Sequence, residues 1–247
     1  MNPSVLIGIV VYNRWESTKK LITSILNTNY SNFQISIIDN ASYDQTVNNL
    51  DQFSNKIKII CNKSRQSFAH CFNQVLNADA DLYCLMTNEI EIDTEDWLQN
   101  LVEKIQSDPM NGICVPVKRA YGKYLIGGKL TTNATCLNIF KEKFEEIEWV
   151  HSCCFLLKKF LLHKIGKFDE QFKVRYYEDV DFCVRATDYN YKIVYDDRVE
   201  ISFFENEPIE LKMCQDINRQ LFVEKNENWL IEHKGKAEKL TRRRKRI

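Results

Sequence analysis

The sequence has few of the residues that interrupt regular structure. Its 247 residues include only 7 glycines and 4 prolines, which argues against a linker-rich or disordered protein. It also lacks a net charge, because 34 Lys and Arg residues balance 34 Asp and Glu residues. A chain with this balance has no general electrostatic attraction for nucleic acid, so we expect no nucleic-acid partner.

Long apolar runs are missing as well. Val5 to Val11 is an apolar run of seven residues, whereas a membrane-spanning helix needs about 18 to 20. The charged start of a secretion signal is also absent. We therefore expect a soluble cytoplasmic protein, or one that contacts the inner face of a membrane peripherally. The basic run Arg242 to Arg246 fits either a solvated chain end or a contact with anionic lipid.

Cysteine is abundant, but no two of the nine cysteines have the CxxC spacing. Without such paired spacing we expect no zinc site. Many of the cysteines have apolar neighbours, for example Cys84, Cys114 and Cys153. This pattern is typical of buried, reduced thiols in a cytosolic protein.

Strand-like and helix-like segments alternate through the first 106 residues. Short β-branched, apolar runs are followed by segments in which apolar residues recur every three or four positions. Four such alternations predict an α/β fold with a mostly parallel sheet and helices on both faces. The strand-like runs are residues 4–12, 33–39, 55–62 and 81–89, and the helix-like segments are 16–28, 44–53, 67–78 and 94–106.

The second half of the chain has a different pattern. Residues 111–150 contain four glycines and little helical periodicity, which predicts short strands or hairpins. Residues 154–166 predict a strand that enters a helix ending at Gly166. Residues 177–196 predict a helix that begins with acidic residues, ends near Asn190 and is followed by a strand. We therefore expect divisions near residues 110 and 205, with a helical extension and basic tail over 206–247.

Polar residues stand at the end of each of the four strand-like runs. In parallel α/β sheets, ligands bind at the carboxyl ends of the strands. One polar strand end is ordinary, but four in series suggest a shared site. These residues are Tyr12 and Asn13, Asp39 and Asn40, Asn62 to Arg65, and Thr87 to Glu89.

Five segments in a fixed order carry a family resemblance. They are VVYNRWESTKKLITSI, IIDNASYDQT, NKSRQSFAHCFNQVL, LMTNEIEI and IGKFDEQFKVRYYEDVDFCVRATDYNYKIVY. Together they resemble family 2 glycosyltransferases of the GT-A fold, the rhamnosyltransferase-like branch in particular, over roughly residues 4–205. The resemblance implies a Rossmann-like fold and an inverting transfer of a sugar from a nucleotide diphospho-sugar to an acceptor hydroxyl. It implies a role in the synthesis of a surface glycan or glycoconjugate.

The resemblance places the nucleotide-sugar in residues 1–110. Asp39 would accept hydrogen bonds from a pyrimidine base, so UDP ranks first as the carrier and dTDP second. The alternative for Asp39 is an Asx turn, and for Ser42, Asp44 and Thr46 a turn and helix cap is favoured. The other predicted donor-binding residues are Tyr12, Asn13, Arg65 (or Lys63), Thr87 and Asn88.

Thr87-Asn88-Glu89 stands where the family usually has a metal-binding DxD motif. Such a motif holds Mg²⁺ or Mn²⁺ against the diphosphate through carboxylate oxygens. The resemblance therefore predicts a divalent ion at Glu89, although the first Asp of the motif is replaced by Thr87. The histidine that completes the metal shell in many relatives is also missing, and Phe203 or Phe204 stands near its position. The alternative for Glu89 and Glu91 is a solvated acidic loop.

The resemblance places catalysis and acceptor binding in residues 111–205. An inverting transfer needs a carboxylate that removes the acceptor proton, and this base is predicted to be Asp179, with Glu178 beside it. Acidic residues that simply favour a helix N-terminus are the alternative. Asp181 and Arg185 have the spacing of a helical salt bridge. The predicted acceptor pocket comprises Trp149, His151, Tyr176 and Tyr177, although Trp149 and His151 also suit a buried core.

Two other classes of protein stay open. A non-catalytic GT-A relative would bind nucleotide or a partner without turnover. A sugar nucleotidyltransferase ranks lower, because VVYNRWEST has no glycine-rich loop for a triphosphate. The acceptor is equally open between a free glycan, a lipid-linked glycan and a protein.

Overall fold

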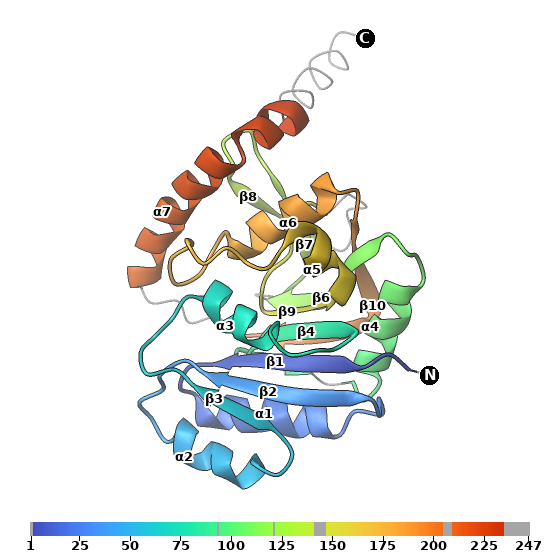
Figure 1. The fold of residues 1–247 in the computed structure, drawn as a ribbon, viewed down its shortest axis with the longest axis vertical. Helices are drawn as coiled ribbons and strands as arrows, with labels where there is room; N and C mark the ends of the chain where they lie inside the picture. Colours follow the sequence, from blue (N-terminus) through green and yellow to red (C-terminus); the bar gives the residue numbers. More distant parts are fainter. Residues whose placement is uncertain (1, 93, 121, 141–146, 205–208, 235–247) are drawn as a thin grey trace.

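Strands and helices alternate in the first half of the chain, as predicted. The computed structural model describes residues 2–92, 94–120, 122–140, 147–204 and 209–234 (Figure 1). The elements of the first half are β1 (Val5–Val11), α1 (Trp15–Leu26), β2 (Phe33–Asp39), α2 (Thr46–Leu50), a 3₁₀ turn (Asp51–Phe53), β3 (Lys58–Cys61), α3 (Phe68–Val75), β4 (Leu82–Thr87), β5 (Ile90–Ile92) and α4 (Trp97–Gln106).

The second half begins with strands and ends with helices and one long strand. The predicted ends of two helices are confirmed, because Gly166 (φ 77°) and Asn190 (φ 62°) have positive φ angles just after them. The elements are β6 (Asn111–Ala120), β7 (Lys123–Leu130), β8 (Cys136–Phe140), β9 (Cys154–Lys158), α5 (Lys159–Ile165), α6 (Glu178–Asp188), β10 (Lys192–Phe203) and α7 (Ile209–Lys225).

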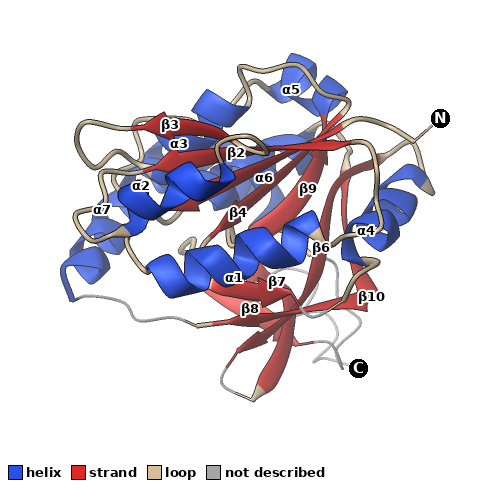
Figure 2. Ribbon diagram, turned by 90° about the horizontal axis from the view of Figure 1, so that it is seen from below, coloured by secondary structure: helices blue, strands red, loops and turns tan. Residues whose placement is uncertain are grey.

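One ten-stranded sheet connects the two halves. Strands β3, β2, β1 and β4 run parallel, which confirms the prediction for the first half. Beyond them, β9 pairs antiparallel with both β4 and β6, whereas β6 and β10 pair parallel, so the sheet is mostly parallel with β9 as an antiparallel interruption. Antiparallel neighbours need no crossover helix, and the described positions of 111–158 contain none. β10 and β5 continue the sheet past β6, while β7 and β8 extend from β6 as a hairpin (Figure 2).

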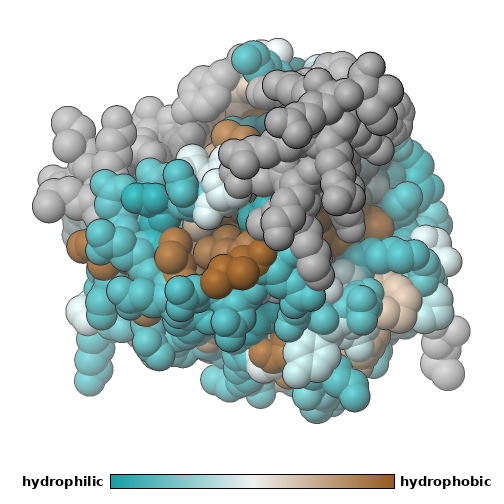
Figure 3. Space-filling view, turned by 90° about the horizontal axis from the view of Figure 1, so that it is seen from above, coloured by the Kyte–Doolittle hydropathy of each residue, from teal (hydrophilic) through white to brown (hydrophobic). Residues whose placement is uncertain are grey.

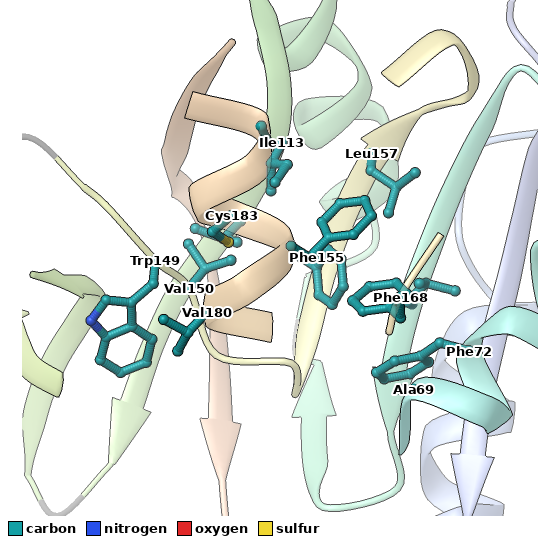
Figure 4. Packing of buried hydrophobic residues seen from close by; sticks show 14 of the residues in the cluster. Ala69, Phe72, Ile113, Trp149, Val150, Phe155, Leu157, Phe168, Val180 and Cys183 are labelled. Atoms are coloured by element: carbon teal, nitrogen blue, oxygen red, sulfur yellow. The ribbon is translucent and has the colours of Figure 1, made fainter. Parts of the chain in front are cut away.

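Helices cover both faces of the sheet, and each face buries its own hydrophobic cluster. Along β1, alternate residues from Val5 to Val11 pack on the side of α1 and α4, whereas Leu6 and Val10 pack on the side of α3, α5 and α6 (Figure 1). In the cluster on the side of α3, α5 and α6, the rings of Phe72 and Phe155 meet edge-to-face with centroids 6.0 Å apart (Figure 4). Both faces are therefore closed, and a ligand must approach along an edge of the sheet.

The predicted helix over residues 44–53 is shorter than expected. α2 covers only Thr46–Leu50, and its cap residue is Gln45 instead of the predicted Asp44. Asp44 Oδ1 accepts the N–H of Thr46 at 2.9 Å, so its side chain closes a turn just before the helix.

The C-terminal extension is helical, as predicted, over α7 and again over residues 227–234. Phe222 and Leu230 pack into the cluster on the α6 side of the sheet. The basic run 242–246 lies outside the described residues. Within the described part of the chain no helix is both long and apolar enough to cross a membrane. The face drawn in Figure 3 is mostly hydrophilic, with a limited apolar area near its middle.

Helix α3 packs unusually close to strand β1 at Gly8. A Cβ atom added to Gly8 would lie 2.5 Å from Cγ2 of Val75, well inside van der Waals contact. The absence of a side chain at Gly8 therefore lets the branched side chain of Val75 rest directly on the strand.

We expect Gly8→Ala to destabilise the protein by about 1 to 3 kcal/mol, because the added methyl group overpacks the core. Urea unfolding followed by circular dichroism measures the effect. Val75→Ala added to the Gly8→Ala variant should recover part of the loss, since it removes the colliding atoms. Equal stability of Gly8→Ala and wild type would contradict the packing described here.

Candidate active site

Three parallel strands end together at one edge of the sheet. Val11 of β1 is paired with Asp39 of β2, and Val10 is paired with Thr87 of β4. The loops that follow these strands surround a cavity of about 330 Å³, which we call the strand-end cavity. The predicted residues Tyr12, Asn13, Arg65, Thr87, Asn88 and Glu89 all line it.

Asp39, also predicted to bind the donor, does not line the strand-end cavity. Its side chain is almost fully buried, and Oδ2 accepts the N–H of Ser42 at 3.1 Å. This contact is the turn that the sequence offered as the alternative. Oδ1 is buried and has no hydrogen-bond partner among the described residues. The carboxylate therefore holds the loop behind the cavity and keeps one acceptor atom unused.

Aromatic and guanidinium groups form part of the cavity wall. Cζ of Arg65 lies 4.2 Å from the centroid of the Tyr12 ring, which is a cation–π contact. Tyr43 meets the Tyr12 ring edge-on with centroids 6.0 Å apart. Arg65 and Tyr43 are exposed, so this part of the wall can receive a planar or anionic group from solvent.

The amides of Asn13 and Asn88 hold the loops in place. Nδ2 of Asn88 donates to the carbonyl oxygen of Asn13 at 2.8 Å and to Oγ1 of Thr18 at 2.9 Å. Oδ1 of Asn13 accepts the N–H of Tyr43 at 2.9 Å. Asn13 has a φ of 56°, a left-handed conformation that Asn tolerates better than most residues. Much of the hydrogen-bonding capacity of these two residues therefore serves the loop structure.

Glu89, the predicted metal ligand, forms ion pairs with two arginines. Nη2 of Arg175 lies 3.3 Å from its Oε2, and Nη1 of Arg14 lies 3.6 Å from its Oε1. Glu91, the other acidic residue considered, pairs with Lys20 at 3.4 Å and does not line the cavity. The alternative of a solvated acidic loop does not hold for Glu89, whose side chain is only 14% exposed.

The residues at this edge do not fit a divalent metal ion. Hard cations such as Mg²⁺ take several oxygen ligands, usually including carboxylates. Across the described ranges, no group of three or more His, Cys, Asp or Glu side chains is placed to hold a metal. Glu89 is the one carboxylate lining the strand-end cavity, and arginines occupy both of its oxygens.

A second cavity, of about 240 Å³, opens at the N-terminus of α6, and we call it the helix-end cavity. Arg175 lines both cavities, so the two adjoin at this side chain. Glu178 does not line the helix-end cavity, because its side chain is buried behind the start of the helix. The predicted residues Trp149, His151, Tyr176, Tyr177 and Asp179 do line it.

Glu178 and Asp179 form a buried acidic pair. Oδ2 of Asp179 accepts the N–H of Ser152 at 3.1 Å, and Oδ1 accepts the N–H of Val180 at 2.9 Å. Oε1 of Glu178 accepts the hydroxyl of Ser152 at 3.4 Å, whereas Oε2 has no partner within the described chain. Burial, together with the neighbouring Asp179 charge, raises the pKa of Glu178 from 4.5 to about 8.

Burial also raises the pKa of Asp179, although its two backbone hydrogen bonds oppose this rise. Two adjacent buried carboxyl groups cannot both ionise easily, so the pair retains a proton near neutral pH. Asp179 accepts two backbone N–H groups and faces the cavity, which favours the anionic form there and the protonated form on Glu178.

His151 and Trp149 form one wall of the helix-end cavity. Their rings meet edge-to-face with centroids 4.7 Å apart, and Nε2 of His151 lies 3.2 Å from Oδ1 of Asn138. Burial lowers the pKa of His151, and the charges of Lys118 and Arg175 lower it further, so the imidazole is neutral. Trp149 also belongs to the hydrophobic core, which was the alternative for this residue, so it both packs in the core and lines the cavity (Figure 4).

Sequence reasoning missed three cationic residues of this site. Arg14 and Arg175 contact Glu89, and Lys118 lines the helix-end cavity with its amine 4.2 Å from the centroid of the Phe203 ring. Arg14 follows the first strand directly and Arg175 precedes the predicted catalytic segment, so position along the chain was an available signal. Lys118 lies within a long strand and offered no such signal.

The loop that carries Arg175 is held by Asn218 of α7. Oδ1 of Asn218 accepts the N–H of Lys173 at 2.8 Å. Its Nδ2 donates to the carbonyl oxygens of Lys173, Arg175 and Tyr176 at 2.8 to 3.0 Å. Three residues of this loop, Val174, Tyr176 and Tyr177, have positive φ angles, which are strained for non-glycine residues. The buried amide therefore offsets strain where the loop enters α6.

The arrangement of strands, helices and two adjoining edge cavities defines a GT-A fold. The chain belongs to glycosyl transferase family 2, whose family model matches residues 6–166. A protein of Haemophilus influenzae described as an uncharacterized glycosyltransferase is 28% identical over 109 residues. That match covers 43% of this chain but only 34% of the relative, so the chain spans about a third of its length. The rhamnosyltransferase-like branch stays a prediction.

Similar solved structures share the fold at low sequence identity. The crystal structure of GalNAc-T7 with UDP, GalNAc and Mn²⁺ has a TM-score of 0.74 and 13% identity, over 90% of this chain and 48% of that one. A mannosyltransferase, PcManGT from Pyrobaculum calidifontis, in complex with GDP-Man and Mn²⁺, has a TM-score of 0.64 and 17% identity, over 85% and 58%. S. aureus TarS 1–349 in complex with UDP-GlcNAc has a TM-score of 0.62 and 17% identity, over 85% and 60%.

We expect Asn218→Asp to destabilise the protein by about 3 to 5 kcal/mol, because a buried carboxylate would face three carbonyl oxygens without a proton to donate. Chemical unfolding measures the change. Gln220→Glu, the same amide-to-acid change at an exposed position of α7, should have little effect. Similar stability of the two variants would show that Asn218 does not hold the loop.

The acidic pair should make stability fall as pH rises. Between pH 4.5 and about 8 the unfolded Glu178 carboxyl loses its proton while the folded one keeps it. Folding then binds a proton, so the free energy of unfolding decreases with pH by up to about 1.4 kcal/mol per unit. Glu178→Gln lacks this contribution, and we expect wild type to lose about 3 to 4 kcal/mol relative to it between pH 5 and pH 8.

His151 also makes the free energy of unfolding depend on pH. Both proteins retain His151, so its effect cancels when they are compared at the same pH. Denaturant unfolding at half-unit pH steps provides the curves. Parallel curves for wild type and Glu178→Gln would contradict a raised pKa at Glu178.

Proposed function

We propose that the protein is an inverting glycosyltransferase that moves a sugar from a nucleotide diphospho-sugar to an acceptor hydroxyl. The observation that carries this proposal is the adjoining of the two cavities at Arg175, with a buried carboxylate facing the second one. A donor in the strand-end cavity would present its sugar toward the helix-end cavity. An acceptor there would lie beside Asp179, which can take its proton.

The donor half of the proposal assigns residues 1–110, together with Arg175, to the nucleotide. Stacking of a base against the wall of Tyr12 and Arg65 would occupy the exposed part of the cavity. The unused Oδ1 of Asp39 is an acceptor suited to the imide N–H of uracil or thymine, if the loop at Ser42 moves aside. UDP therefore ranks first and dTDP second. UDP in GalNAc-T7 and UDP-GlcNAc in TarS support a uridine donor, while GDP-Man in PcManGT keeps guanosine in the test.

The acceptor half assigns residues 111–205 to the acceptor and to catalysis. As the acceptor oxygen attacks C1 of the sugar, its proton passes to Asp179 and the bond from C1 to the diphosphate breaks on the opposite face. Protonated Glu178 would stay behind Asp179 and limit the negative charge of the pair. The neutral imidazole of His151 can exchange a hydrogen bond with an acceptor hydroxyl. No step is assigned to the predicted Mg²⁺ or Mn²⁺, because the residues at Glu89 do not fit one.

The acceptor is proposed by class only. A free glycan, a lipid-linked glycan or a protein hydroxyl would each satisfy the chemistry, within the synthesis of a surface glycan or glycoconjugate. A peripheral contact of residues 242–246 with the inner face of a membrane, and a cytoplasmic location, stay predictions. A non-catalytic relative is the second candidate, and the altered residues at Thr87 to Glu89 favour it. It would bind a nucleotide without turnover.

We expect Asp179→Asn to lower the transfer rate by about 10²- to 10⁴-fold, because the amide cannot accept the acceptor proton. Release of nucleoside diphosphate from UDP-, dTDP- and GDP-sugars measures the slow transfer to water, and calorimetry measures nucleotide binding. Glu178→Gln should cost less, and nucleotide affinity should stay unchanged in both variants. Asp197→Asn, an exposed aspartate away from both cavities, is the matched control.

Two outcomes would redirect the proposal. Tight nucleotide binding with no release from any donor, in wild type and variants alike, would identify the non-catalytic relative. If Asp179→Asn releases nucleoside diphosphate as fast as wild type, the proposal of a transferase stands but Asp179 is not its base.

A further inference from the structure

We propose that Arg14 and Arg175 supply the positive charge that stabilises the departing diphosphate in the strand-end cavity, in the place where a GT-A enzyme with a DxD motif holds a metal ion. Glu89 orients the two guanidinium groups, and it is not a metal ligand. This inference rests on the proposed transferase function. It concerns how the leaving group is neutralised, which is separate from the identity of the base.

Two of the three residues at the end of β4 already have other partners. The amide of Asn88 is bonded to Asn13 and Thr18. Thr87 is buried and uncharged, and its hydroxyl has no hydrogen-bond partner among the described residues. Glu89 alone has a charge, and its two oxygens face Arg175 and Arg14 at 3.3 and 3.6 Å. A cation binding there would have one carboxylate, and it would first have to displace two guanidinium groups.

The charge of the strand-end cavity suits a diphosphate directly. Three guanidinium groups line it, those of Arg14, Arg65 and Arg175, against the single carboxylate of Glu89. The formal excess is two positive charges, which equals the charge of one divalent ion. A divalent metal ion bound by two aspartates has no net charge. The arginines of this cavity leave an excess of two positive charges, so they attract a diphosphate without a metal ion. Arginine is well matched to phosphate because its planar fork donates two parallel hydrogen bonds.

Arg175 is held in position before any ligand arrives. Its side chain is only 11% exposed, and its Cζ lies 5.0 Å from the ring centroid of Phe68 and 5.4 Å from that of Tyr176. Its backbone carbonyl is bonded to Asn218, in the loop with left-handed residues. Donors that are oriented in advance toward developing charge need little reorganisation during the reaction.

The location of Arg175 also matches the bond that breaks. It lines both cavities, so its guanidinium lies where a donor sugar would join its diphosphate. When C1 bonds to the acceptor oxygen, the electron pair of the C1–O bond stays on the diphosphate. The arginines stabilise that added charge, and the acceptor proton goes to Asp179. Arg14 contacts the other carboxylate oxygen of Glu89, and its Nη1 also lies 3.4 Å from the carbonyl oxygen of Phe204.

The test is UDP binding by calorimetry in EDTA, in Mg²⁺ and in Mn²⁺, with dTDP and GDP as further probes. We expect wild type to bind its nucleotide with nearly the same affinity in all three conditions. Arg175→Ala should weaken binding in EDTA by roughly 10- to 100-fold, since a charge-assisted hydrogen bond is lost. Arg175→Lys keeps the charge but not the forked guanidinium, and its affinity for UDP should lie between those of wild type and Arg175→Ala. This variant controls for a loss of binding that is caused by misfolding.

Glu89→Gln separates the two roles of Glu89. If it only orients arginines, removing its negative charge should tighten UDP binding severalfold in EDTA. If it binds metal, Glu89→Gln should abolish any gain in affinity from Mn²⁺. Lys159→Met removes one positive charge near the start of β4, at the opposite edge of the sheet, and should change nothing.

Two results would overturn the inference, and they are distinguishable. Nucleotide binding and sugar transfer that require Mn²⁺ or Mg²⁺, with Arg175→Ala binding as tightly as wild type, would reject the arginine role and leave the transferase proposal intact. Absence of binding for UDP, dTDP and GDP under every condition would reject the transferase proposal and this inference with it.

Discussion

The edge of the sheet that forms the candidate site depends on one buried amide, that of Asn218. Four hydrogen bonds connect it to the backbone of residues 173–176. That segment carries Arg175, contains strained left-handed residues and leads into the helix that begins with Glu178 and Asp179. Without the amide, the strain in the loop would be relieved by a different backbone path. The guanidinium group of Arg175 and the acidic pair would then no longer be held in a fixed position relative to each other. Helix α7 is therefore part of the site, although it lies outside the family match.

The charges of the site are divided between its two cavities. The strand-end cavity is lined by three arginines and one carboxylate. The helix-end cavity is lined by Asp179, which forms with the buried Glu178 an acidic pair that burial keeps partly protonated. Arg175 stands between them and lowers the pKa of both carboxyl groups, against the larger effect of burial. The result is a site with excess positive charge on one side and, on the other, a carboxylate that burial makes more basic. This separation suits the proposed transfer, in which an anionic group leaves and a neutral hydroxyl attacks.

Much of this arrangement could be predicted from the sequence, for reasons of local physics. Hydrophobic periodicity located the alternating elements, and the polar residues after successive strands met at one edge because parallel strands end together. Other features depend on contacts between distant segments and left no local pattern. The pairing of β9 with β4, the ion pairs of Glu89 with Arg14 and Arg175, and the hydrogen bonds from Asn218 join residues about 40 to 90 positions apart. The position of Asp39 behind the cavity wall belongs to the same group, because it depends on the turn at Ser42.

The pairing of β4 with β9 also limits how the molecule can move. Hydrogen bonds from Leu82–Lys158 to Met86–Cys154 join the two halves of the chain within one sheet, with no linker between them. Many ligand-binding proteins open and close by rotating two domains about a hinge. Here such a rotation would shear a buried sheet, so the spacing between the two cavities is set by the backbone itself. For the proposed reaction, the loops at the sheet edge are therefore the parts that would have to rearrange as substrates enter and leave.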